Sequence, residues 1–218
     1  MKIIPLFACA LLSFVVAAKA APLSGTRSVG PTGDYASITA AIADIQAQTL
    51  GGALVLELQP AYVSSVETFP LVFTNLTTTA TNTLTLRPAA GAVALAISSA
   101  AARTVDLNGA QFVTIDGRPG GVGSNAGSGG GAASQLTIAN TSTSGAALRF
   151  FNEASSNTLR YTTLRGVSTS FTVVHFADTT GANGNDNNTL DHCDVRDGAS
   201  TPAYGIYSGG HWHHGEVQ

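Results

Sequence analysis

Short runs in which apolar residues alternate with threonine, serine or charged residues recur along most of the chain. The clearest run is 157–166, which begins Asn-Thr-Leu and ends at glycine, and related runs begin at Asn82, Gln111 and Asn188. A period of two is typical of strands with one buried face, and turn residues separate nearly every pair of runs. The pattern predicts strands at 53–58, 69–74, 83–87, 93–97, 104–107, 112–115, 135–139, 147–151, 158–164, 171–176, 189–195 and 204–207.

One segment has the period of a helix instead. Its apolar residues share one face of a helix, and they are Ile38, Ala41, Ile42 and Ile45. Ser37 stands where an N-cap residue is expected. We expect a helix from Ser37 to about Thr49, ended by Gly51 and Gly52.

Many short strands fit either an antiparallel sandwich or a solenoid of stacked coils. The repeated Asn-Thr-Leu openings, the pairing of runs into units of about 20–30 residues, and the scarcity of Asn-Gly hairpin turns favour the solenoid. We therefore predict an all-β right-handed parallel β-helix over residues 21–208, with the short N-terminal helix capping one end. Residues 117–134 are predicted to be a flexible insertion, and 209–218 an irregular tail of a truncated chain.

Stacking explains the composition. Strands about 4.8 Å apart place equivalent side chains of successive coils above one another. Apolar residues then fill the inside, while threonine, serine and arginine face outward. Asparagine at a repeated corner hydrogen-bonds to local backbone and to its neighbours in adjacent coils. Four phenylalanines are assigned to the core: Phe150, Phe151, Phe171 and Phe176.

The first twenty residues have the pattern of a cleaved secretory signal peptide. Lys2 precedes an apolar stretch, and Ala18-Lys19-Ala20 fits the small-x-small cleavage rule. A lipoprotein alternative would use Cys9. We expect an extracellular or cell-surface protein with no membrane span after cleavage, and with Cys193 as its single cysteine.

The net charge of the chain bears on which macromolecules it can bind. The net charge of the whole chain is −3, and removal of the signal peptide removes both lysines, so the mature chain is more acidic. A mildly acidic surface without lysine argues against a nucleic-acid partner.

The best candidates for acid–base chemistry surround the 189–195 run. Stacked coils could bring Asp191, Asp194, His175 and Arg196 together, and paired carboxylates can act on a sugar. The alternative is that these side chains are outward and solvated, with Cys193 packed inside as a small apolar group.

The residues that could bind a glycan or a metal ion are marked less clearly than the acid–base candidates. Tyr161, Tyr204 and Tyr207 could stack on sugar rings of an extracellular polysaccharide or cell-surface glycan. Asp186 lies in an Asn-rich segment that could bind Ca²⁺, although its spacing fits no full calcium loop and an Asn-rich corner explains it as well. A histidine cluster near the C-terminus could bind a transition metal, although incidental histidines explain it equally: His211, His213 and His214. We expect no cofactor, with calcium as the one open alternative.

The segments G-P-T-G-D-Y-A-S-I-T-A-A-I, T-N-T-L-T-L-R-P, V-T-I-D-G-R and G-N-D-N-N-T-L resemble the large secreted β-helix surface proteins of Bacteroidetes-type bacteria. The first is also similar to the N-terminal cap of pectin methylesterases and other pectin-lyase-like proteins. The resemblance covers nearly all of the mature chain and implies the fold. It does not carry over an active site, because the Asp strand of pectin methylesterases and the N-T-D, D-D and G-H-G signatures of polygalacturonases are absent.

Three functions stay open. The chain is a non-catalytic adhesion scaffold or glycan-binding surface, a pectin-lyase-like carbohydrate-active enzyme using Asp191, Asp194 and His175 on acidic polysaccharide, or the first coils of a longer fibre-like protein. We favour the first.

Overall fold

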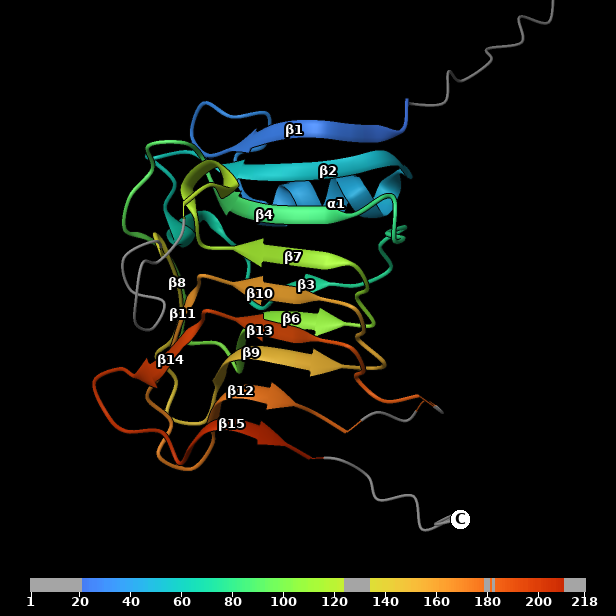
Figure 1. The fold of residues 1–218 in the computed structure, drawn as a ribbon. Coiled ribbons are helices and arrows are strands. Elements are labelled where there is room, and N and C mark those ends of the chain that lie inside the picture. The colour runs from blue at the N-terminus through green and yellow to red at the C-terminus, as the bar shows by residue number, and fades with distance from the viewer. Residues whose placement is uncertain (1–20, 124–133, 179–180, 182, 210–218) are drawn as a thin grey trace, which may run out of the picture.

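The computed structural model describes residues 21–123, 134–178, 181 and 183–209, and within them the strands form three sheets in which every pair is parallel (Figure 1). Sheet A runs in the order β1 (Leu23–Val29), β2 (Leu50–Leu58), β4 (Leu84–Pro88), β7 (Val113–Asp116), β10 (Thr158–Arg160) and β13 (Thr189–Asp191). Sheet C contains β5 (Leu95–Ser99), β8 (Leu136–Asn140), β11 (Thr163–Gly166) and β14 (Asp194–Asp197). Sheet B contains β3 (Leu71–Phe73), β6 (Arg103–Asn108), β9 (Ala146–Phe151), β12 (Thr172–Phe176) and β15 (Tyr204–Ser208).

The chain visits the sheets in a fixed order. From β4 onward it passes through A, then C, then B, and each later strand pairs with the strand of the preceding passage. We call one such passage a coil. In the first coil the short 3₁₀ turn η1 (Ser64–Val66) stands between β2 and β3, where later coils have a sheet C strand. The predicted parallel pairing is confirmed, and the arrangement is consistent with an all-β parallel solenoid.

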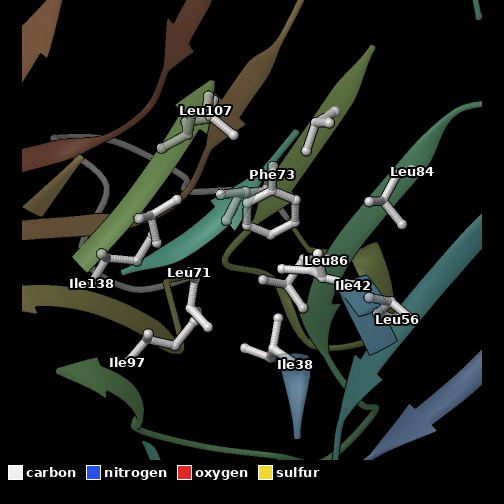
Figure 2. Close-up of a cluster of buried hydrophobic side chains, with 14 of the residues drawn as sticks. Ile38, Ile42, Leu56, Leu71, Phe73, Leu84, Leu86, Ile97, Leu107 and Ile138 are labelled. Carbon is white, nitrogen blue, oxygen red and sulfur yellow. The ribbon is translucent and has the colours of Figure 1, made fainter. Parts of the chain in front are cut away.

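The hydrophobic core is built from columns of apolar side chains that strand pairing aligns from one coil to the next. In sheet A, Leu56, Leu86, Ile115 and Leu159 are direct partners in successive strands and are fully buried. Each fully buried aliphatic side chain contributes about 1.5–3 kcal/mol relative to exposure, so aligned columns provide much of the stability. Figure 2 shows residues of all three sheets meeting in one buried cluster, among them Leu71, Leu86 and Ile138.

One helix lies at the N-terminal end of this core. The helix α1 (Ile38–Ala47) buries the predicted face, and Figure 2 shows Ile38 and Ile42 within the same cluster. The Ser37 hydroxyl accepts a hydrogen bond from the Ala40 N–H at 3.0 Å, as expected of an N-cap. The Glu67 carboxylate accepts from the Ile38 and Thr39 N–H groups at 2.7 and 2.8 Å, which satisfies two further helix donors.

The helix ends at Ala47, two residues before the predicted end, and the glycines do not terminate it. Gly51 and Gly52 belong to β2, because Leu50 already pairs with Leu23 of β1. The strand β1 itself was not predicted, since its polar run has only two buried side chains, Leu23 and Val29.

Two predicted strands are each two strands in different sheets. The run 158–164 divides into β10 and β11 at Tyr161, and 189–195 divides into β13 and β14 at His192. Both residues have left-handed backbone, with φ of 48° and 50°. Large side chains rarely adopt this conformation, so the alternating pattern gave no sign of a corner.

The predicted asparagine corner is confirmed between β9 and β10 and its equivalent one coil later. Asn157 is fully buried; its Oδ1 accepts from the Val113 N–H at 3.0 Å and its Nδ2 donates to the Ala110 carbonyl at 2.8 Å. It also donates to Asn188 Oδ1 at 2.9 Å, which links two coils. The asparagines therefore satisfy backbone groups that the turn leaves without strand partners.

Residues 117–123, at the start of the predicted insertion, have a defined structure. Arg118 pairs with Asp116, and the 3₁₀ turn η2 (Pro119–Gly121) follows it. Gln135 N–H donates to the Gly117 carbonyl at 2.8 Å, so the two ends of the segment meet. Residues 124–133, the signal-peptide residues 1–20 and residues 210–218 of the predicted tail lie outside the described residues.

Candidate functional site

The four acid–base candidates lie on three different sheets, and only Asp194 and Arg196 are in contact. Asp191 ends β13 in sheet A, Asp194 and Arg196 lie on β14 in sheet C, and His175 lies on β12 in sheet B. Asp191 Oδ1 lies 2.5 Å from His192 Nδ1, and Asp194 forms an ion pair with Arg196. The predicted four-residue cluster was wrong, because the corner at His192 turns the chain between Asp191 and Asp194.

Cys193 packs inside as a small apolar group, which was the alternative to a catalytic site. It packs against the core, and its Sγ lies 3.4 Å from the Leu159 carbonyl oxygen. Burial raises the pKa of the Cys193 thiol, which keeps it protonated and unreactive near neutral pH.

His175 belongs to an outward column of sheet B. Asp106, Arg149, His175 and Tyr207 are register partners in four successive strands. Arg149 binds Asp106 through two hydrogen bonds, at 2.9 and 2.5 Å. Burial and then the positive charges of Arg103 and Arg149 lower the pKa of His175, so its imidazole is neutral at pH 7.

Aromatic rings continue from this column across the sheet. The Phe171 ring meets His175 edge-on, with centroids 4.9 Å apart, and the Arg103 guanidinium lies 4.9 Å above Phe171. Tyr207 lies 5.9 Å from His175 and 5.4 Å from Tyr204. We call these five residues the sheet B platform.

The platform is open to solvent at one end. Tyr204 is 55% exposed and Tyr207 is 42% exposed, whereas Phe171 and His175 are half-buried. Aromatic faces bind the C–H faces of sugar rings, while tyrosine hydroxyls supply a polar edge. The platform includes two of the three tyrosines proposed from the sequence, Tyr204 and Tyr207.

Two phenylalanines were wrongly assigned to the core. Phe150 and Phe176 stack with centroids 4.4 Å apart and pack with the core, as predicted. Phe171 instead lies on the platform, and Phe151 lies under the Arg149 guanidinium at 4.5 Å. Both stand next to residues of the outward column, a position that apolar character alone cannot distinguish from a core position.

Tyr161 has a different environment from Tyr204 and Tyr207. The Arg118 guanidinium of the preceding coil lies 4.5 Å from its ring centroid, and His192 of the following coil stacks on it at 4.8 Å. Its ring therefore has less open face for a ligand.

A buried ion cluster lies beside this stack and was not found from the sequence. The Asp116 side chain is fully buried and accepts hydrogen bonds from Arg118 Nη2 at 2.8 Å and Arg160 Nε at 2.9 Å. Burial alone would raise the pKa of Asp116, but the hydrogen bonds from Arg118 and the charge of Arg160 outweigh it and lower the pKa. A possible signal was the register of the 113–116 and 158–160 strands, which pairs Asp116 with Arg160.

The proposed calcium segment uses its amides elsewhere. Asn185 Oδ1 accepts from the Ala154 N–H at 3.1 Å, Asn188 Oδ1 accepts from Asn157, and Asp186 is exposed. No three His, Cys, Asp or Glu side chains gather in a metal-binding group within the described parts of the chain. His211, His213 and His214 lie outside those parts, so the transition-metal hypothesis is untested.

No protein-family model, curated protein or solved structure matches the chain. Among the residues that the structure describes, no helix has the length and apolar character needed to cross a bilayer.

Proposed function

We propose that this chain is a right-handed parallel β-helix module of a secreted or cell-surface bacterial protein, and that it acts without catalysis as an adhesion scaffold or glycan-binding surface. The fixed A, C, B order of parallel strands supports the β-helix, and its handedness follows the general rule for parallel crossovers. The resemblance to pectin-lyase-like surface proteins and the signal-peptide pattern support export.

The observation that carries the proposal is the sheet B platform. Tyr204, Tyr207, His175 and Phe171 form a connected set of ring contacts, and the Arg103 guanidinium lies over the Phe171 ring. Rings held by parallel strands keep fixed spacing, which lowers the conformational entropy lost when a ligand binds. The sugar class bound here is extracellular polysaccharide or cell-surface glycan.

The alternative is a pectin-lyase-like carbohydrate-active enzyme acting on acidic polysaccharide. It has less support, because Asp191, Asp194 and His175 lie on three different sheets, and general acid–base catalysis needs its groups within reach of one bond.

A glycan array probed with the whole chain tests the proposal. Replacement of Tyr204 or Tyr207 by alanine should weaken binding of a retained glycan about 2–10-fold each, since an aromatic contact contributes about 0.5–1.5 kcal/mol. The matched Tyr→Phe variants keep the ring and should bind nearly normally. Retention of glycans unaffected by both alanine variants would refute the platform, and polysaccharide cleavage lost with Asp191→Ala would favour the enzyme.

A further inference from the structure

A groove of about 630 Å³ lies on the outward side of sheet C and shares no lining residue with the sheet B platform. Its floor is built from strands β5, β8 and β11, and its walls come from Thr141 and Thr143 after β8 and from residues 198–200 after β14. Small-molecule sites usually span about 300–1,000 Å³, so the groove is large enough for a ligand of a few rings.

The floor offers two kinds of contact. Ala96 and Ala139 present methyl groups, and Ser98 and Thr137 present hydroxyls that make no side-chain hydrogen bond within the described residues. These residues face outward because their strand neighbours, such as Ile97 and Ile138, are buried. Methyl groups suit the C–H face of a sugar ring, and unpaired hydroxyls suit its hydroxyl groups.

One cation lines the groove. Arg165 is exposed, and its Nε donates to the backbone carbonyl of Asp197 at 3.3 Å. Its register partner Arg196 pairs with Asp194, but Arg165 has no carboxylate at ion-pair distance in the described part of the chain. A guanidinium free of an acidic partner is well suited to a ligand carboxylate, which it can bind through two hydrogen bonds.

Among the described residues, Arg165 is the one charged residue in the groove lining, which favours a ligand with a single negative charge. On the neighbouring strand β14, Asp194 is paired with Arg196, while Asp197 would repel further anions, and the remaining lining residues are uncharged. A polymer with a carboxylate on every sugar would therefore fit poorly, because it needs a cation at each repeat.

We propose that the sheet C groove binds a short glycan carrying one acidic sugar, whose carboxylate is held by Arg165. This inference rests on glycan recognition as the proposed function and adds a second site with its own ligand class. Selectivity here comes from charge, whereas the platform selects by ring stacking.

Isothermal titration calorimetry with the whole chain tests the groove. The probes are sialyllactose, which carries one carboxylate, lactose as its neutral counterpart, and trigalacturonate as a polyanion. We expect sialyllactose to bind at least tenfold more tightly than either of the others. Arg165→Gln should weaken sialyllactose binding about tenfold or more, as expected for loss of a charged hydrogen bond.

Arg27→Gln is the matched control, because it removes the same charge from β1 of sheet A, which contributes no residue to the groove lining. It should leave sialyllactose binding unchanged. Equal losses in both variants, or equal binding of lactose, would overturn the groove proposal, as would tighter binding of trigalacturonate or no binding of sialyllactose.

A double variant, Tyr204→Ala with Tyr207→Ala, separates this proposal from the platform. Sialyllactose binding that depends on Arg165 but not on these tyrosines supports the groove, whatever the array shows for the platform. Sialyllactose binding that depends on the tyrosines but not on Arg165 overturns the groove and leaves glycan recognition by the platform standing.

Discussion

Asp116→Asn should destabilise the fold more than any exposed ion pair on the same sheet. The Asp116 side chain is fully buried and accepts from Arg118 N and Nε as well as from the two guanidinium nitrogens described above. Asparagine keeps the shape and one acceptor oxygen but removes the charge that offsets two arginines. Their guanidinium groups would then face a neutral partner.

The magnitude follows from burial. Removing one partner of a buried ion pair costs about 3–5 kcal/mol when the remaining charge is trapped. Here the Arg118 and Arg160 side chains are 14% and 39% exposed, so both can turn partly toward water. We therefore expect the free energy of unfolding to fall by about 2–3 kcal/mol.

The assay is equilibrium urea unfolding followed by circular dichroism, with Glu57→Gln as the matched control. Glu57 pairs with Arg87 on the same sheet, and both side chains are about a quarter exposed. Partly exposed pairs contribute at most about 1 kcal/mol, so the control should change little.

The effect should also depend on pH. The folded-state pKa of Asp116 lies below its ordinary value of 3.8, so its stabilising contribution is fully present above that value. It is lost as the pH falls through the lower folded-state pKa, and the difference between wild type and Asp116→Asn should shrink there. A loss no larger than that of Glu57→Gln, or one independent of pH between 2 and 6, would refute the reasoning.

Three further predictions concern the helix, the corner and the thiol. Glu67→Gln should lower the free energy of unfolding by about 1–2 kcal/mol and speed amide exchange in α1, because it weakens the contacts to the Ile38 and Thr39 N–H groups. Normal exchange in α1 would contradict this. Asn157→Ala should cost about 2–4 kcal/mol in urea unfolding by leaving buried backbone groups unpaired, whereas Asn82→Ala, which loses one side-chain bond to Leu50, should cost about 1 kcal/mol. Equal costs would show that the Asn157 hydrogen bonds contribute little. In a Cys9→Ser chain, Cys193 should react slowly with a thiol reagent at pH 8 and rapidly in urea, since burial raises its pKa; rapid labelling of the native chain would contradict this.

Strand positions and parallel pairing could be predicted from the sequence because both follow from local alternation and repetition. The N-terminal helix could be predicted for the same reason, through its apolar face and the Ser37 cap. The predicted element boundaries were wrong where pairing with a neighbouring strand determines them. Gly51 and Gly52 look like helix terminators, yet pairing with β1 draws them into a strand.

The candidate site was harder to predict, because facing directions depend on where the corners fall. A corner formed by Tyr161 or His192 has no glycine to mark it, and missing it leaves Asp191 and Asp194 on one continuous strand instead of in two different sheets. Phe171 was assigned to the core for a related reason. Its position beside the outward column depends on contacts with other coils, such as that with Arg103, which the local sequence pattern does not contain.

The meeting of Gly117 and Gln135 has a consequence for how such a chain can change. Strands on both sides keep their register, with Ile115 opposite Leu159 and Ile138 opposite Leu164. Lengthening a surface segment costs only about 0.6 kcal/mol per doubling. We therefore expect that the segment between Gly117 and Gln135 can be exchanged, in evolution or by grafting a foreign epitope, without changing the coils on either side.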